Sequence, residues 1–267
     1  MLKYPILLVH GMGFRDGNII NYWGRIPKVF ENDGNKIFYG NQDSNGTIEN
    51  NAAVLKSRIE TIINETGAEK LNVIAHSKGG LDMRYAISSL GMGKYIASLT
   101  TVSTPHNGSK TIDKIMQLPK GMVKFVGKCS DIWLRVLGDK NPDAYKVYCS
   151  FSSENAKKFN TENPDDPNVY YQSYAFAMKN SFSDIIMTIP HSIIYLVEGE
   201  NDGLLTPDSA KWGDFKGTVR GSGNRGISHC DEVDLRRRKF TSKSSEGISD
   251  ILEVYGDILN ELKNKGF

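Results

Sequence analysis

The sequence lacks an apolar run long enough to cross a membrane as a helix, which needs about 18 uninterrupted apolar residues. The nearest run, residues 185–197, is broken by a threonine, a proline, a histidine and a serine. Near the start, apolar residues 5–9 lead directly into His10 and Gly11, which predicts a strand rather than an export signal. We therefore expect no transmembrane segment and, for the sequence as written, a cytoplasmic chain. A mature secreted form is the alternative.

Cysteine is also scarce. The chain has three cysteines, Cys129, Cys149 and Cys230, too few for a disulfide framework. One interpretation is a single Cys129–Cys149 bridge in an exported protein, and the other is a set of buried reduced thiols. The spacing of cysteines and histidines matches no zinc site.

The sequence has no large excess of positive or of negative charge. With 33 basic and 31 acidic residues the formal net charge is +2, which gives no reason to expect nucleic acid as a partner. The densest basic run is residues 236–239 (RRRK), and we interpret it as a solvated helix face.

Short β-rich apolar runs alternate with longer helical patterns along the chain. The predicted strands are residues 6–9, 36–39, 71–75, 97–103 and 192–197, and the predicted helices are 22–32, 47–66, 80–89 and 247–263. This alternation predicts an α/β fold with a mostly parallel central sheet and helices on both faces. At 267 residues the chain suits a single domain, residues 1–267.

One segment does not follow this alternation. Almost ninety residues separate the strand predicted to end near residue 104 from the one predicted near 192, and residues 112–137 within that stretch are strongly apolar. We predict a helical cap or lid inserted at about residues 110–160. It is either a fixed cover or a lid that opens at a lipid surface.

The most informative motif is residues 75–80 (AHSKGG), directly after the apolar run 71–74. A serine between small residues at the junction of a strand and a helix is typical of a nucleophile elbow, G-x-S-x-G, here with Ala75 in the first glycine position. Small neighbours let the backbone turn sharply and expose the hydroxyl of Ser77. The pattern alone is common, so the interpretation depends on partners elsewhere.

A nucleophilic serine needs a base, and in α/β-hydrolases the acid and then the histidine follow the serine in the sequence. Of the five histidines, His229 is the one that follows Ser77 in a loop before the last predicted helix. We therefore predict that His229 is the base.

The acid is expected just after the predicted strand 192–197, where the candidates are Glu198, Glu200 and Asp202. Asp202 is preferred because its Asn-Asp-Gly sequence predicts a turn that aims the carboxylate back towards the sheet edge. Glu200 is the second choice.

Two backbone N–H groups are expected to form the oxyanion hole. One belongs to Lys78, at the start of the helix after the nucleophile. The second is assigned to Met12, in the glycine-containing loop of residues 10–13 (HGMG) after the first strand. The Met12 side chain is expected either to line an acyl pocket or to serve as apolar filling.

Together, these motifs resemble the bacterial true lipases, the triacylglycerol lipases of the Pseudomonas, Burkholderia and Proteus type and their clostridial relatives. The resemblance spans nearly the whole chain and rests on residues 10–14 (HGMGF), 75–80 (AHSKGG), 103–109 (STPHNGS), 201–204 (NDGL) and 229–233 (HCDEV). It implies an α/β-hydrolase fold, with the triad and oxyanion positions matching those assigned above.

The same resemblance implies a structural calcium ion that holds the histidine loop. The implied ligands are the carboxylates of Asp184 and Asp231 and the backbone carbonyls of Leu235 and Lys239. Two carboxylates with carbonyl groups and water are a suitable set for a hard cation. The alternative from the residues alone is that Asp231 caps the following helix.

We therefore predict a serine carboxylester hydrolase, a lipase acting on acylglycerol esters at a lipid–water interface, with no organic cofactor. An esterase for soluble short-chain esters is the alternative, and a phospholipase or thioesterase would use the same residues. A catalytically silent hydrolase fold that binds lipid or a protein partner is the alternative from another class.

Overall fold

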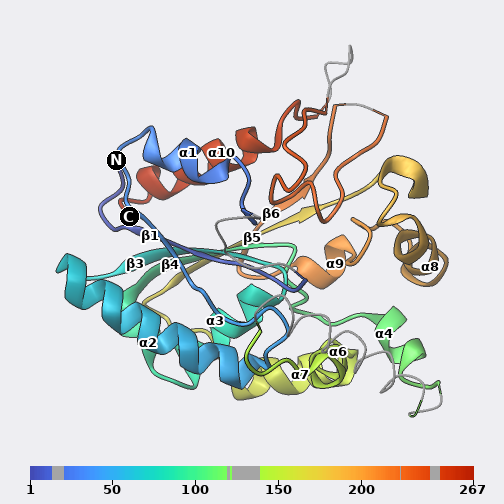
Figure 1. Ribbon diagram of the computed structural model, residues 1–267, viewed down its shortest axis with the longest axis horizontal. Coiled ribbons are helices and arrows are strands. Elements are labelled where there is room, and N and C mark those ends of the chain that lie inside the picture. Colours follow the sequence, from blue (N-terminus) through green and yellow to red (C-terminus); the bar gives the residue numbers. More distant parts are fainter. Residues whose placement is uncertain (14–20, 119–120, 122–138, 223, 241–246) are drawn as a thin grey trace.

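The computed structural model describes residues 1–13, 21–118, 121, 139–222, 224–240 and 247–267. Within them the chain forms a six-stranded sheet in the order β2-β1-β3-β4-β5-β6, with every neighbouring pair parallel (Figure 1). The strands are β1 (Ile6–Val9), β2 (Ile37–Tyr39), β3 (Leu71–His76), β4 (Ile96–Val102), β5 (Tyr170–Phe176) and β6 (Asp214–Val219). The predicted parallel α/β architecture is confirmed.

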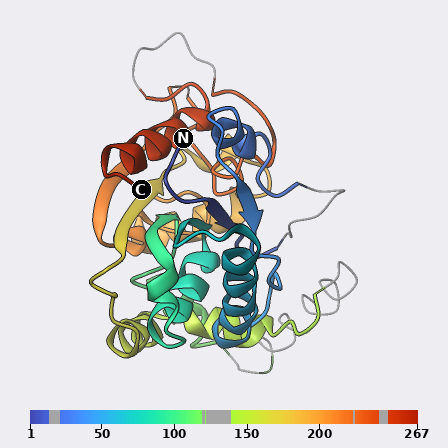
Figure 2. The same ribbon diagram turned by 90° about the vertical axis from the view of Figure 1, so that its left-hand side faces the viewer.

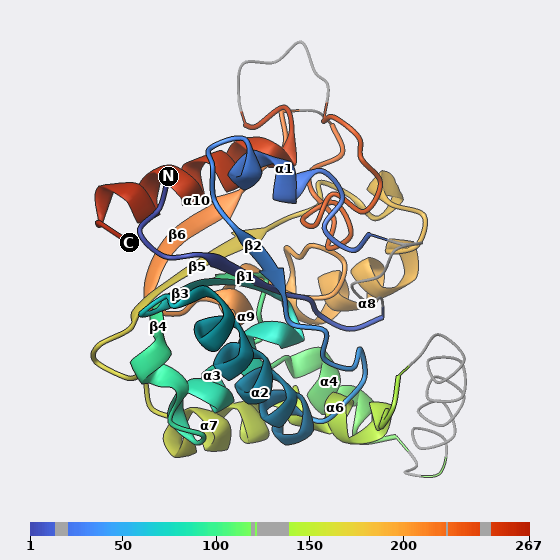
Figure 3. The same ribbon diagram turned by 60° about the vertical axis from the view of Figure 1, so that its left-hand side comes forward.

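Helices cover both faces of this sheet, as predicted. Figures 2 and 3 show α1 (Ile26–Glu31) and α10 (Ile251–Asn264) on one face and α2 (Ile48–Thr66) and α3 (Lys78–Ser88) on the other. Strand β1 alternates between them: Ile6 and Leu8 belong to the core under α1 and α10, and Leu7 and Val9 to the core under α2 and α3. All four side chains are fully buried, which explains an uninterrupted apolar strand.

The two ends of helix α2 are determined by signals in the neighbouring sequence. Helix α2 begins after Thr47, whose hydroxyl accepts a hydrogen bond from the Asn50 N–H, and ends at Gly67 with φ of +67°. Its bounds differ by one residue from the predicted 47–66. The other predicted helices are shorter or shifted at their ends, because caps and tertiary contacts decide the last turn.

The predicted strand 192–197 is wrong, because these residues belong to helix α8 (Thr188–Glu198). Their isoleucine, tyrosine and valine side chains favour strands, but Pro190 lies in the first helical turn, where its missing N–H is tolerated. Gly199, with φ of +90°, ends the helix. The sheet is instead completed by β5 and β6, which the sequence analysis missed, although the aromatic run of β5 (YYQSYAF) is a strand signal.

Short helices occur within the predicted 110–160 insertion and near the carboxyl end of the strands (Figure 1). They are α4 (Lys110–Ile115), α6 (Ala144–Ser150), α7 (Ser153–Glu162) and, from a separate segment, α8. Residues 119–120 and 122–138 of the predicted 110–160 insertion lie outside the described residues, so its extent and movement stay predictions. Three smaller elements complete the described chain: η1 (Met92–Tyr95), η2 (Ser181–Ser183) and α9 (Pro207–Ala210).

None of the described helices is both long enough and apolar enough to span a bilayer. Cys149 and Cys230 are free thiols. Cys129 lies outside the described residues, and the free thiol of Cys149 favours the interpretation of reduced thiols over a Cys129–Cys149 bridge.

Candidate active site

Ser77 occupies the turn between β3 and α3. Its φ of +54° and ψ of −132° are unfavourable for a residue with a side chain, and its N–H donates to the Val102 carbonyl oxygen at 2.9 Å. Such strain persists only where the surrounding structure enforces it, and it concentrates at functional sites. The predicted sharp strand-to-helix turn is therefore present, with Ser77 half-buried at its tip.

The small residues after Ser77 are required by close backbone packing. A Cβ on Gly79 would lie 2.5 Å from the His10 carbonyl oxygen and 2.8 Å from that of Val9. A Cβ on Gly80 would collide with the Thr104 side chain. The elbow thus packs directly on the end of β1, beside the loop that carries Met12.

Gly79→Ala is expected to lower the free energy of unfolding by about 3 kcal/mol, because neither carbonyl oxygen can move away without distorting β1. Thermal and urea unfolding measure the change. Gly256→Ala in α10 is the matched control: its Cβ would meet no atom within 4 Å. That variant is expected to gain about 0.5–1 kcal/mol from helix propensity. Equal effects in both variants would contradict the packing account.

His229 and Asp202 form a buried pair. His229 Nδ1 lies 2.9 Å from Asp202 Oδ2, and the His229 N–H donates to the Asp202 carbonyl oxygen at 2.8 Å. The N–H groups of Leu204 and Leu205 each donate to Asp202 Oδ1 at 2.8 Å. With Nδ1 engaged, Nε2 is the ring nitrogen left to accept a proton.

Electrostatics keep the Asp202 carboxylate ionised. Burial alone would raise its pKa, but the charge of His229 and hydrogen bonds from His229, Glu232 and the Leu204 N–H outweigh burial and lower the pKa to about 2. An ionised acceptor at this position fixes the imidazole tautomer and stabilises an imidazolium.

Asp202 reaches this position by a route the sequence analysis did not predict. It follows α8 rather than a strand, and the Met178 N–H bonds the Asn201 carbonyl oxygen at 2.9 Å, which returns the chain to the end of β5. The other candidate acids have different partners. Glu200 pairs with Arg220 at 2.8 Å, and Glu198 accepts from Ser109 Oγ at 2.8 Å.

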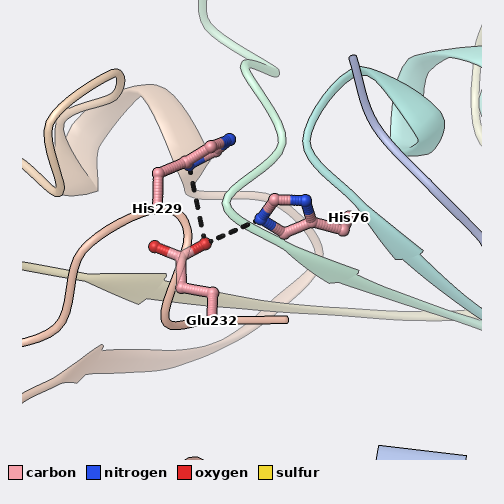
Figure 4. Close-up of side chains that lie close together, drawn as sticks. All are labelled: His76, His229 and Glu232. Atoms are coloured by element: carbon pink, nitrogen blue, oxygen red, sulfur yellow. Dashed lines mark hydrogen bonds and ion pairs between the residues drawn. The ribbon is translucent and has the colours of Figure 1, made fainter. Parts of the chain in front are cut away.

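The sequence analysis missed Glu232. Figure 4 shows its carboxyl group between two histidines: Oε2 lies 3.0 Å from His76 Nε2 and 3.6 Å from His229 Nδ1. Tyr22 extends the chain of contacts, since its hydroxyl lies 2.6 Å from His76 Nδ1 and accepts from the Gly11 N–H at 2.9 Å. The available signal was only an acid three residues after His229, in a run that also contains Asp231 and Asp234.

The surroundings of Glu232 favour its neutral form. Burial, followed by the charge of Asp202, raises the pKa of Glu232 well above its usual range, and burial lowers the pKa of His76 well below its own. Although His76, His229 and Glu232 are close enough to bind a metal ion, the Nδ1 of His229 is already engaged by Asp202. A neutral hydrogen-bonded chain fits these contacts better than a metal centre.

Of the two predicted oxyanion donors, Lys78 directly follows Ser77 in the chain. The N–H of Lys78 lies in the first turn of α3, where backbone N–H groups have no partner within the helix. The Lys78 side chain points elsewhere, because its Nζ pairs with Asp82 Oδ1 at 2.6 Å in the interior. Met12 lines the same cavity as Ser77. Their role as donors stays a prediction.

An apolar cavity of about 420 Å³ contains Ser77 and His229 in its wall. Other residues in its wall come from the loop after β1, from α4 and α6, from the segments before and after α8, and from the loop of His229. They include Met12, Ile112, Tyr148, Phe151, Met187, Leu204, Leu205, Val233 and Leu235. The predicted base and nucleophile therefore border one space, whose apolar surface suits a hydrocarbon chain.

The residues expected to hold calcium come together only in part. Asp184 and Asp231 lie on either side of Ser228, whose Oγ is 2.6 Å from Asp184 Oδ2 and 2.8 Å from Asp231 Oδ2. Leu235 lines the apolar cavity, whereas Lys239 lines a separate small pocket with Asp231 and Arg238.

The carboxylate oxygens of both aspartates already accept protein hydrogen bonds, from Arg236 on Asp184 and Arg238 on Asp231. This arrangement does not fit calcium ligation. The predicted solvated helix face at 236–239 is also wrong, because two of its arginines are ion-paired and the backbone there is turn and irregular structure.

Comparison with known proteins places the chain in a family. Residues 5–221 match the family model described as palmitoyl protein thioesterase. The chain is 31% identical over 262 residues to triacylglycerol lipase 2 of Saccharomyces cerevisiae, covering 93% of this chain and 75% of the yeast protein. It is 30% identical over 173 residues to a triacylglycerol lipase of Vibrio cholerae, covering 61% and 55% of the two chains.

Solved structures share the fold. The mature lipase BlEst2 of Bacillus licheniformis matches with a TM-score of 0.64 at 21% identity, over 87% of each chain. A metagenomic carboxyl esterase matches with a TM-score of 0.75 at 16% identity, over 99% of this chain and 77% of the esterase. With the yeast and bacterial relatives, these matches confirm the resemblance to lipases. The chain belongs to the palmitoyl protein thioesterase family as that model describes it, among the lipases and esterases of α/β-hydrolase fold.

Proposed function

We propose that this protein hydrolyses carboxylic esters of long apolar acyl groups, as a lipase, through an acyl-enzyme on Ser77. The observation that carries the proposal is the 2.9 Å contact between His229 and Asp202, in the wall of the apolar cavity that also contains the strained Ser77. The triacylglycerol lipase relatives support the same substrate class.

In the first half-reaction, Ser77 Oγ attacks the ester carbonyl carbon while His229 Nε2 takes the hydroxyl proton. The N–H groups of Met12 and Lys78 donate to the oxyanion, and Asp202 stabilises the imidazolium. The C–O bond to the alcohol then breaks, and His229 returns the proton to the departing alkoxide. A water molecule repeats the sequence on the acyl-enzyme and releases the acid.

A lipid surface is the proposed site of substrate uptake, because α8 presents apolar side chains to solvent. We define the α8 apolar face as Ile189, Ile193 and Leu196 of this helix together with Ile185 in the turn before it; Ile185 is 90% exposed and Leu196 is 85% exposed. Met187, between Ile185 and Ile189, lines the cavity. An exposed apolar face beside an apolar cavity is typical of a surface that meets lipid.

Replacing Ile189 and Leu196 together by serine is expected to lower the rate on emulsified long-chain triacylglycerol roughly tenfold, since apolar contact with the lipid is lost. The rate on dissolved p-nitrophenyl butyrate should stay unchanged. Val54→Ser is the matched control, because Val54 is 44% exposed on α2 and is not among the residues that line the apolar cavity. Parallel losses on both substrates would contradict uptake from a lipid surface.

The acyl-chain profile tests the substrate class directly. Hydrolysis of p-nitrophenyl esters from two to sixteen carbons is expected to favour the long chains. Preference for the shortest chains below their solubility limit would support the esterase alternative.

A palmitoyl thioester belongs in the same series, since the matching family model is described as a thioesterase. A higher kcat/KM for the thioester than for the matching oxygen ester would assign the chain to that activity. No turnover of any of these substrates would support a silent binding fold.

A further inference from the structure

The loop that carries His229 is fastened by two buried carboxylates. The side chains of Asp184 and Asp231 are 0% and 4% exposed, and the single hydroxyl of Ser228 lies within 2.8 Å of an oxygen of each. Ser228 precedes His229, and Asp231 follows it by two residues. Two carboxylates this close repel each other strongly in the interior, so the arrangement needs positive charge beside it.

Two guanidinium groups supply that charge. Arg236 Nη2 donates to Asp184 Oδ1 at 2.6 Å, and its Nη1 contacts Asp184 Oδ2. On the other side, Arg238 donates from Nε and Nη2 to the two oxygens of Asp231, each at 3.0 Å. Two negative and two positive charges therefore balance, in the paired geometry that planar guanidinium groups favour.

Backbone donors use further acceptor positions. The Ile186 N–H donates to Asp184 Oδ1 at 2.9 Å, and the Ser228 N–H donates to Asp231 Oδ2 at 3.2 Å. Each of the four carboxylate oxygens thus accepts at least one hydrogen bond. A divalent cation could bind these oxygens only by displacing an arginine, and it would add charge to a cluster that is already neutral.

We propose that Arg236 and Arg238 take the place of a metal ion in this chain, holding Asp184 and Asp231 together and so fixing the loop of His229. The arginines are positioning residues, since they act on His229 through Ser228 and Asp231. This inference concerns the stability of the loop and does not depend on which ester the protein hydrolyses.

The first test uses the unmodified protein and thermal unfolding. Its Tm is expected to differ by less than about 1 °C between 1 mM EDTA and 5 mM CaCl2, because a ligand stabilises a protein only if it binds the native state. Isothermal titration with CaCl2 should show no binding. A Tm lower by several degrees in EDTA, or saturable calcium binding, would overturn the proposal.

The second test removes the two guanidinium charges. Arg236→Gln/Arg238→Gln is expected to lower the Tm by roughly 10 °C in EDTA, because it leaves two buried carboxylates without positive charge. CaCl2 should restore part of that loss. Arg237→Gln is the matched control, since Arg237 is exposed between the two arginines, and its Tm should stay unchanged in either buffer.

A double variant whose Tm does not respond to calcium would overturn the proposal that the arginines replace a cation. If the double variant does not fold, Arg238→Gln alone is measured, since Arg238 is the more exposed of the pair at 28%. The Tm of Arg238→Gln should likewise rise when CaCl2 replaces EDTA, and a Tm that does not change would overturn the proposal.

Discussion

Ser77→Ala is expected to lower kcat/KM for a long-chain p-nitrophenyl ester by about 10⁵-fold or more, as loss of a serine nucleophile does in a working triad. The variant removes only Oγ, so the Cβ and the backbone strain at φ of +54° are retained. Its Tm should therefore match that of the parent. A loss of activity can then be attributed to the missing hydroxyl and not to unfolding.

The control for this variant is Ser57→Ala, on the exposed side of α2, where the hydroxyl donates to the Ala53 carbonyl oxygen at 3.3 Å. That change should leave kcat/KM within twofold of the parent. Ser77→Ala retaining more than about 1% of the parental activity would contradict the assignment of Ser77 as the nucleophile.

Asp202→Ala is expected to lower kcat/KM by about 10²- to 10³-fold, and adding Glu232→Gln should lower it by at least a further tenfold. In the single variant a second carboxyl group remains, with Glu232 Oε2 3.6 Å from His229 Nδ1 in the parent structure. Glu232→Gln alone should cost less than tenfold, because Asp202 still holds the histidine. If the double variant were no slower than Asp202→Ala, Glu232 would have no such reserve role.

The pH profile separates the two acids. Asp202, with a pKa lowered to about 2, stays ionised across the working range of the parent. The pKa of Glu232 is raised by burial and then by the charge of Asp202, so it falls towards its usual range when that charge is removed, but burial still holds it up. Only an ionised Glu232 carboxylate can stabilise the His229 imidazolium by charge, as Asp202 does in the parent. The ratio of parental to Asp202→Ala activity should therefore fall as pH rises, and a constant ratio would contradict this account.

The elements that the sequence predicted well are those fixed by local signals. Strand β1 and helix α2 have apolar patterning and capping within their own residues, and the elbow at Ser77 needs only small neighbours and a strand before it. Asp202 and His229 were chosen from residue order and turn chemistry, and the structure places the two side chains in contact.

The sequence-based predictions failed for residues whose structure depends on contacts with distant parts of the chain. Helix α8 has the composition of a strand, but its partners are the cap helix α4 and η2 rather than the sheet. Glu232 meets His76 across 156 positions, and Arg236 meets Asp184 across 52, so neither partner is visible from local pattern. The run 236–239 was interpreted as a solvated surface because Asp184, the buried partner of Arg236, lies in another segment.

The central claim is that Ser77 is the acyl-accepting nucleophile of an ester hydrolase. It is tested most directly by incubating the protein with a long-chain p-nitrophenyl phosphonate and locating the adduct by mass spectrometry of peptides. The account predicts one adduct per chain, on Ser77, formed in step with loss of activity and absent from Ser77→Ala. An active protein that forms no adduct, or one modified at another residue, would contradict it.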